Sequence, residues 1–102
     1  MRTLLFFDLP TLTLEHKKTY RTFTKELIRC GWYRIQESVF VRLNLNQQSA
    51  DSAINHLNEV KPKEGNVYII TITEKQFAKM KILIGDVETD VISSDKRVIK
   101  LW

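Results

Sequence analysis

The sequence predicts a small α+β domain in which two helices cover one face of an antiparallel β-sheet. Short runs of aromatic and β-branched residues alternate along the chain with two stretches of helical periodicity. The 102 residues contain only three Gly and two Pro, and 43% of them are apolar against 27% charged, which excludes a disordered or fibrous chain. One domain spanning residues 1–102 is therefore expected.

The first element is a buried strand over residues 3–8, rich in Leu and Phe, which Pro10 ends because proline lacks the N–H that a strand ladder needs. A helix follows from Thr13, its candidate N-cap, to Gly31. Four residues of this helix are spaced i, i+3, i+7, i+10 and should face the core: Tyr20, Phe23, Leu27 and Cys30.

Basic residues lie on the opposite side of the same helix. Lys18, Arg21, Lys25 and Arg29 form a continuous stripe on the helical wheel. A solvated helix face is the simplest interpretation, and phosphate binding is the alternative. Sixteen Lys and Arg against twelve Asp and Glu give a formal charge of +4, which favours anionic partners without identifying them.

The rest of the chain supplies further strands and helices. Residues 32–43 read as a second extended stretch that should pair with the first strand or lie beside it, and apolar spacing over 50–57 predicts a helix that ends before Pro62. Residues 67–73 read as a strand, 74–80 as a short helix, and 82–84 and 98–102 as further strands. The order predicts a ferredoxin-like βαββαβ sandwich with an additional C-terminal strand.

The second face of this sheet is expected to be apolar as well. Apolar residues are consecutive at 4–7, 39–41 and 67–70, and consecutive strand residues point to opposite faces. We expect a second copy to cover the uncovered face, giving a sheet-to-sheet homodimer with two-fold symmetry. The C-terminal segment 96–102 is expected to pair with the edge of the partner's sheet.

Asp8 is the one candidate for catalysis. An Asp at a strand end ordinarily accepts hydrogen bonds from the next turn, but two copies of Asp8 facing each other across a dimer axis would bind Mg²⁺, which activates water for phosphodiester hydrolysis. His16 and His56 are interpreted as surface or capping residues. Cys30 is interpreted as a buried hydrophobe because no histidine is positioned beside it, and no cysteine-histidine metal pattern is recognised.

The compartment follows from cysteine content and from the N-terminus. A single cysteine cannot form an internal disulfide, which suits a reducing cytosol. The apolar run that meets Asp8 is too short for a signal peptide or a membrane span. A soluble, cytoplasmic protein with no membrane partner is expected.

Several segments together resemble a known family. A first strand ending in Asp8, a basic helix, and the run Gln-Glu-Ser-Val-Phe at 36–40 resemble the signature of the CRISPR-associated endoribonuclease 2 family, the second core adaptation protein. Segments 8–11, 73–80 and 94–99 resemble the variant found with type II systems, and the match covers nearly the whole chain.

The resemblance implies a ferredoxin-like homodimer that sits between two dimers of the CRISPR integrase and holds prespacer DNA during spacer acquisition. For some members it also implies Mg²⁺-dependent cleavage of single-stranded RNA or double-stranded DNA, with the metal near the strand-end Asp, here Asp8. Many members carry an Arg pair after the first strand. Lys17 and Lys18 stand there in this chain, which keeps the charge but loses the bidentate geometry that arginine offers phosphate.

Three functions therefore stay open. The first is a DNA-binding scaffold, in which basic residues contact phosphates without reading bases: Lys17, Lys18, Arg21, Lys25, Lys96 and Arg97. The second is an Mg²⁺-dependent nuclease with Asp8 as metal ligand, and the third is a toxin-like ribonuclease related to virulence-associated protein D. We favour the scaffold, because one carboxylate per chain is little for an active site.

Overall fold

The computed structural model describes residues 1–85 of the chain. Its elements in chain order are β1 (Arg2–Asp8), α1 (Leu14–Arg29), β2 (Tyr33–Gln36), β3 (Val39–Leu43), α2 (Gln47–Val60), β4 (Asn66–Ile72) and α3 (Glu74–Ala78). The strands form one antiparallel sheet in the order β2-β3-β1-β4. The strand predicted at 98–102, with Lys96 and Arg97, lies outside the described residues.

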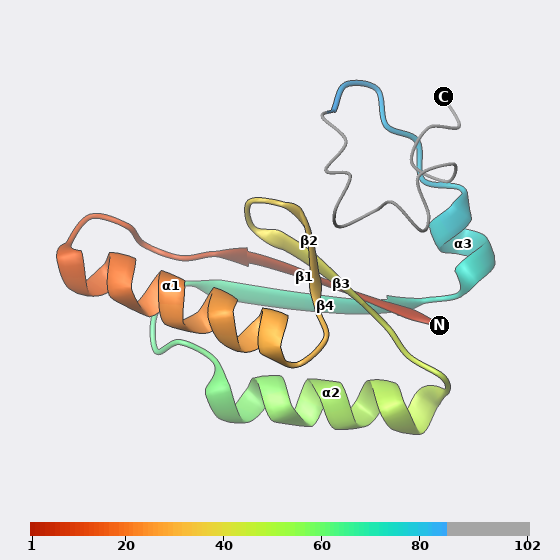
Figure 1. Cartoon of the computed structure of the whole chain (residues 1–102), viewed down its shortest axis with the longest axis horizontal. Coiled ribbons are helices and arrows are strands. Elements are labelled where there is room, and N and C mark those ends of the chain that lie inside the picture. Colours follow the sequence, from red (N-terminus) through yellow and green to blue (C-terminus); the bar gives the residue numbers. More distant parts are fainter. Residues whose placement is uncertain (86–102) are drawn as a thin grey trace.

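The main core lies between the sheet and the two long helices. Figure 1 shows α1 and α2 together on one side of the sheet. Odd-numbered residues of β1 point to that side, where Leu5 is fully buried and Phe7 packs edge-on against Phe23 of α1, with ring centres 5.3 Å apart. Leu57 brings α2 into the same cluster. The covered face thus has the single layer of helices that the sequence predicts.

The ends of α1 match the predicted ones. The Thr13 hydroxyl accepts a hydrogen bond from the His16 amide at 3.0 Å, which makes Thr13 the N-cap. Cys30 is the C-cap, and Gly31 follows with a φ of 91°, a conformation that glycine adopts without a steric penalty. The second helix ends at Val60, as predicted from Pro62.

The extended stretch over 32–43 is a hairpin rather than one continuous strand. It turns at Glu37 and Ser38, so only β3 pairs with β1, while β2 pairs with β3 alone and forms an edge of the sheet. A register shift between Arg34 and Gln36 marks an irregularity in the hairpin. The prediction missed the turn because residues 32–43 contain none of the Gly, Pro, Asn or Asp residues that most often mark one.

The strand predicted at 82–84 is wrong. These residues form a bend after α3, and Leu83 and Ile84 are almost fully exposed. A strand needs a ladder partner, and by this point the chain has left the sheet through α3. Apolar composition alone suggested the strand, and composition does not report whether a sheet edge is within reach.

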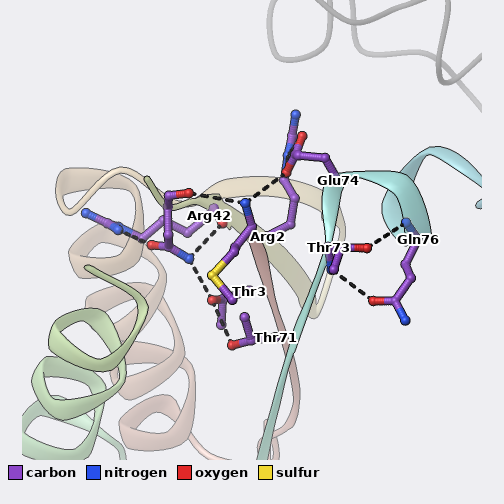
Figure 2. Close-up of polar contacts among 9 residues, drawn as sticks. Arg2, Thr3, Arg42, Thr71, Thr73, Glu74 and Gln76 are labelled. Atoms are coloured by element: carbon purple, nitrogen blue, oxygen red, sulfur yellow. Dashed lines mark hydrogen bonds and ion pairs between the residues drawn. The ribbon is translucent and has the colours of Figure 1, made fainter. Parts of the chain in front are cut away.

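The short helix α3 is fixed to the N-terminal end of β1. Its N-terminus carries a capping box, in which Thr73 and Gln76 exchange hydrogen bonds (Figure 2). Glu74 receives the Arg2 Nε–H at 3.0 Å, and the Arg2 guanidinium stacks over the ring of Phe77, 4.6 Å from its centre. This helix lies on the side of the sheet away from α1 and α2 (Figure 1).

That second side of the sheet is apolar and only partly covered. Phe77 buries Leu4 and Val41, which lie on it by strand alternation. Four further residues on this side, here called the open-face patch, are exposed over 41% to 68% of their surface: Phe6 (41%), Tyr33 (50%), Tyr68 (68%) and Ile70 (50%). The strand registers place them in two adjacent rows, so the patch is continuous across the sheet.

Candidate nucleic-acid interface and metal-ligating residues

Asp8 lies at the end of β1 on the same side of the sheet as the open-face patch. It pairs with Asn66 of β4, one row beyond the pair of Phe6 with Tyr68, and it is exposed. Over the described part of the chain, Asp8 belongs to no group of three or more His, Cys, Asp or Glu donors. Within residues 1–85, Asp8 therefore lacks the cluster of oxygen ligands that Mg²⁺ prefers.

The backbone at Asp8 is held by a close approach of the turn that precedes β4. A Cβ placed on Gly65 would lie 2.6 Å from the Asp8 carbonyl oxygen and 2.8 Å from a methyl group of Leu9. Gly65 also has a φ of 96°, in the region that only glycine adopts readily. On the side of β1 that faces β3, the Phe7 amide donates a hydrogen bond to the Ser38 carbonyl at 3.1 Å. Both contacts fix the strand end that carries Asp8.

The basic side of α1 is exposed. Lys17, Lys18, Arg21 and Lys25 all face solvent, and within residues 1–85 none of the four makes an ion pair. Arg29 belongs to the predicted stripe but is bound to Glu26, one turn earlier on the same helix, with its Nε 2.9 Å from Glu26 Oε1. Lys18, Arg21 and Lys25 are thus available for phosphate contacts along one line of the helix, with Lys17 beside it.

His16 is half-buried rather than a simple surface residue. Its Nε2 lies 3.4 Å from Glu64 Oε2, a contact that links the start of α1 to the turn before β4, while its Nδ1 is buried without a hydrogen-bond partner. Both residues line a groove of about 860 Å³ between α1 and the end of α2. The interpretation of His16 as a surface residue is corrected by this contact, which depends on the packing of two segments distant in sequence.

Cys30 and His56 are also placed differently from the sequence interpretation. His56 of α2 brings its Nε2 to 3.3 Å from the Cys30 sulfur and 2.9 Å from Glu26 Oε2. The Cys30 thiol in turn lies 3.5 Å from the same carboxylate oxygen. A histidine is therefore positioned beside the cysteine, and these three residues form the one group of potential metal ligands within residues 1–85.

The surroundings shift the pKa values of Glu26 and Cys30 in opposite directions. Hydrogen bonds from Arg29 and then from His56 lower the pKa of the Glu26 carboxyl from 4.5 to about 2, so it is a carboxylate at neutral pH. Burial, and then the hydrogen bond to Glu26, raise the pKa of the Cys30 thiol. Without a metal ion the cluster therefore holds one fixed negative charge beside a protonated thiol.

The sequence contained only part of the signal for this cluster. Glu26 and Cys30 are spaced i, i+4 on one helix, which places them on the same side one turn apart. His56 is twenty-six residues after Cys30, and it meets them only because α1 and α2 pack side by side on the sheet (Figure 1). No local spacing rule reports such a contact.

Among the described residues, no helix is both long enough and apolar enough to cross a membrane. The geometry defines the class of the protein: a small α+β domain with a four-stranded antiparallel sheet, helices over one face, an apolar patch on the other, and a cationic helix surface.

Comparison with known proteins narrows this class to one family. The family model described as CRISPR associated protein Cas2 matches residues 1–80. A CRISPR-associated endoribonuclease Cas2 of Treponema denticola is 43% identical over 101 residues, covering 99% of this chain and all of the relative. One of Streptococcus mutans serotype c is 44% identical, covering 99% of this chain and 93% of the relative. The chain belongs to the Cas2 family.

A solved structure supports the fold. The crystal structure of Streptococcus pyogenes Cas2 at pH 6.5 superimposes with a TM-score of 0.62, covering 81% of this chain and 99% of that one, at 21% sequence identity. The family model and the two relatives confirm the family predicted from the strand-end Asp8 and the run at 36–40.

Proposed function

We propose that this chain is a CRISPR adaptation protein, a ferredoxin-like homodimer that binds prespacer DNA together with the CRISPR integrase during spacer acquisition. The observation that supports this most directly is the exposed cationic side of α1, formed by Lys17, Lys18, Arg21 and Lys25, which makes no ion pair within residues 1–85. Side chains of this kind neutralise phosphates and carry no information about base sequence. Lys96 and Arg97, which lie outside the described residues, are proposed to contact phosphates as well.

The open-face patch supports the homodimer. It lies on the face of the sheet opposite α1 and α2, so a partner that covered it would leave the cationic side of α1 free. Two copies related by a two-fold axis would then present one cationic helix on each outer side of the dimer. Such an assembly bridges DNA without a catalytic step.

The test is a titration of a short DNA duplex at several salt concentrations. Affinity should fall steeply with salt and should be equal for two unrelated sequences. Replacing Lys18, Arg21 and Lys25 together with alanine should weaken binding and reduce the slope of log K against log salt by about one for each lost phosphate contact. The matched control replaces three exposed lysines beyond the sheet, Lys75, Lys79 and Lys81, and changes the net charge equally.

Equal loss of affinity in both triple variants would contradict a specific role for α1, and binding without salt dependence would remove the scaffold proposal. Recovery of the chain with the integrase and a DNA duplex in one complex of defined stoichiometry tests the partner. A chain that binds DNA but never enters such a complex would contradict the adaptation role.

A second candidate function is an Mg²⁺-dependent endonuclease acting on RNA or DNA. The observation that favours it is the position of Asp8, which is exposed on the open face one row beyond the patch. Two protomers that meet through this face would bring two Asp8 carboxylates towards the two-fold axis. Those carboxylates would hold Mg²⁺, which supplies an activated water for phosphodiester hydrolysis. The names of the relatives describe an endoribonuclease, which agrees with this candidate.

The nuclease is tested with Asp8→Asn, which keeps the shape of the side chain and removes its charge. Cleavage of single-stranded RNA and double-stranded DNA should require Mg²⁺ and should be lost in this variant. Asp51→Asn, at an exposed position on α2, is the control and should cleave normally. Equal cleavage by the Asp8→Asn protein would assign the activity to a contaminant.

A further inference from the structure

A second potential metal site lies between the two long helices, away from the strand end that carries Asp8. Glu26 and Cys30 come from α1 and His56 comes from α2, and their donor atoms all lie within 4.8 Å of one another. We propose that these three side chains bind one transition-metal ion, with Zn²⁺ as the ion best suited to the donor set.

The separations of the donor atoms fit a single tetrahedral ion. Zinc bonds of about 2.3 Å to sulfur, 2.0 to 2.1 Å to nitrogen and 2.0 to 2.2 Å to oxygen place tetrahedral ligand atoms about 3.4 to 3.6 Å apart. The distance from Cys30 Sγ to His56 Nε2 is 3.3 Å, and the distance from Cys30 Sγ to Glu26 Oε2 is 3.5 Å. The distance from His56 Nε2 to Glu26 Oε2 is 2.9 Å, so this pair must open by only about half an ångström.

The same geometry disfavours a catalytic cysteine. A histidine that activates a thiol uses one ring nitrogen for the sulfur and the other for the orienting carboxylate. Here the single atom Nε2 of His56 faces both the Cys30 sulfur and the Glu26 carboxylate. Three donor atoms that converge on one point can coordinate one metal ion. A proton relay instead needs the histidine between the other two groups, with a different ring nitrogen facing each.

The types of the ligands select the ion. Thiolate and imidazole prefer Zn²⁺ and neighbouring transition metals, while Mg²⁺ prefers oxygen ligands alone. Three protein ligands leave a fourth tetrahedral position for water. The Glu26 and His56 side chains are 25% and 33% exposed, and Cys30 is half-buried, so an ion can reach the cluster from solvent.

Two arginines form hydrogen bonds with the residues of this cluster. Arg29 donates to Glu26 Oε1 at 2.9 Å, which orients the carboxylate as hydrogen bonds to metal-binding carboxylates commonly do. Its second contact is to Oε2, the oxygen that faces the other two ligands, so an ion must displace that contact. Arg42 donates to the Cys30 carbonyl at 3.1 Å and fixes the end of α1. Bound metal would therefore join the C-terminal turn of α1 to the middle of α2.

The experiment uses the purified full chain after treatment with a chelator and its removal. Calorimetric titration with Zn²⁺ should show one ion per chain, and thermal unfolding should shift to higher temperature in its presence. Titration with Co²⁺ should give the near-ultraviolet absorption of a thiolate-to-cobalt bond. Cys30 is the only cysteine in the chain, so this band reports on one residue.

The variants separate this site from adventitious binding. Cys30→Ser should abolish the cobalt band, and His56→Gln should weaken Zn²⁺ binding by about tenfold or more. His16→Gln removes the only other histidine and is the matched control, which should bind normally, as should Asp8→Asn. Circular dichroism of each variant verifies that it folds.

Three results would overturn the proposal. The first is the absence of stoichiometric Zn²⁺ binding by the unmodified chain. The second is that the His56→Gln protein, shown by circular dichroism to be folded, binds metal with an unchanged cobalt spectrum, while His16→Gln or Asp8→Asn abolishes binding. Excess Mg²⁺ should not displace the bound Zn²⁺, and displacement would likewise contradict a site built on sulfur and nitrogen.

Discussion

At the scale of single residues, Gly65 is the position where the backbone tolerates least change. An alanine there would have to adopt a backbone φ of 96°, and its Cβ would lie 2.6 Å from the Asp8 carbonyl oxygen. We expect Gly65→Ala to lower the free energy of unfolding by about 1 to 3 kcal/mol, measured by urea denaturation at fixed protein concentration. It should also displace the strand end that carries Asp8.

Gly31 supplies the control for this prediction. Its φ of 91° is similar, but a Cβ there would have its nearest neighbour at 3.7 Å, an ordinary contact with the side chain of Arg42. Gly31→Ala therefore carries the backbone penalty without the collision and should destabilise less than Gly65→Ala. Equal effects would mean that the approach to Asp8 contributes nothing.

Asn44 is a buried polar residue that joins three segments. Its Nδ2 donates to the Thr3 hydroxyl at 2.7 Å, its backbone amide donates to the Met1 carbonyl at 2.8 Å, and Arg42 donates to its Oδ1. Thr3 is fully buried and also shares a hydrogen bond with Thr71 of β4 at 3.1 Å (Figure 2). The network therefore links β1, β4 and the end of β3 on the covered side of the sheet.

Asn44→Ala should lower the free energy of unfolding by about 1 to 3 kcal/mol, because it leaves the buried hydroxyl of Thr3 and the Arg42 guanidinium with fewer partners. Asn58→Ala is the control, since Asn58 is exposed and its side-chain oxygen accepts a hydrogen bond from the Lys61 ammonium at the surface. That change should stay within about 0.5 kcal/mol. A neutral result at Asn44 would show that water replaces its side chain.

At the scale of elements, α3 is a single short turn that a few named contacts hold against the sheet. Five residues are too few for a helix to be stable alone, so its capping box, its contacts with Arg2 and the burial of Phe77 hold it in place. Its attachment also decides how much of the open face is covered, because Phe77 packs on Leu4 and Val41.

Phe77→Ala should release α3 without unfolding the sheet. In hydrogen exchange, the amides of Phe77, Lys79 and Met80, which donate within this turn, should lose protection. The amide of Leu5 in the central strand should keep it. Lys75→Ala, at an exposed position of the same helix, is the control and should leave both sets unchanged. Loss of protection throughout the sheet would show that α3 and the sheet unfold together.

At the scale of the whole molecule, the homodimer proposed above depends on the open-face patch. A lysine introduced at Tyr68, which is 68% exposed on β4, would place like charges across the proposed two-fold interface. Tyr68→Lys should therefore convert the proposed dimer to a folded monomer at micromolar concentration, as measured by sedimentation or light scattering. DNA bridging should be lost with the dimer.

Ile28→Lys is the matched control for this change. Ile28 is 57% exposed on α1, on the helix side of the sheet, and its replacement adds the same charge outside the patch. This variant should stay dimeric. An unmodified chain that is monomeric and well folded at these concentrations would contradict the homodimer, the DNA-bridging role and the shared Asp8 site together.

Local sequence patterns were enough to predict both ends of α1, the end of α2, the number of layers and the family. Caps and breakers act over a few residues, so Thr13 and Gly31 were sufficient to bound α1 and Pro62 to end α2, whereas the N-cap of α2, Asn46, was not predicted. The consecutive apolar residues of β1 were sufficient to predict apolar side chains on both faces, because strand alternation is a local rule. The run at 36–40 and the strand-end Asp8 indicated the family that the comparisons confirm.

Which distant residues meet depends on how the helices and strands pack together. The break of 32–43 into a hairpin, the loss of a strand at 82–84, and the contacts of Glu26 with His56 and of His16 with Glu64 all depend on how elements pack in three dimensions. Residues of one helix are related by a fixed period, but no fixed period relates α1 to α2. The relative position of the two helices is set by the shape of the sheet and of the core side chains between them. The sequence therefore did not reveal that His56 joins Glu26 and Cys30.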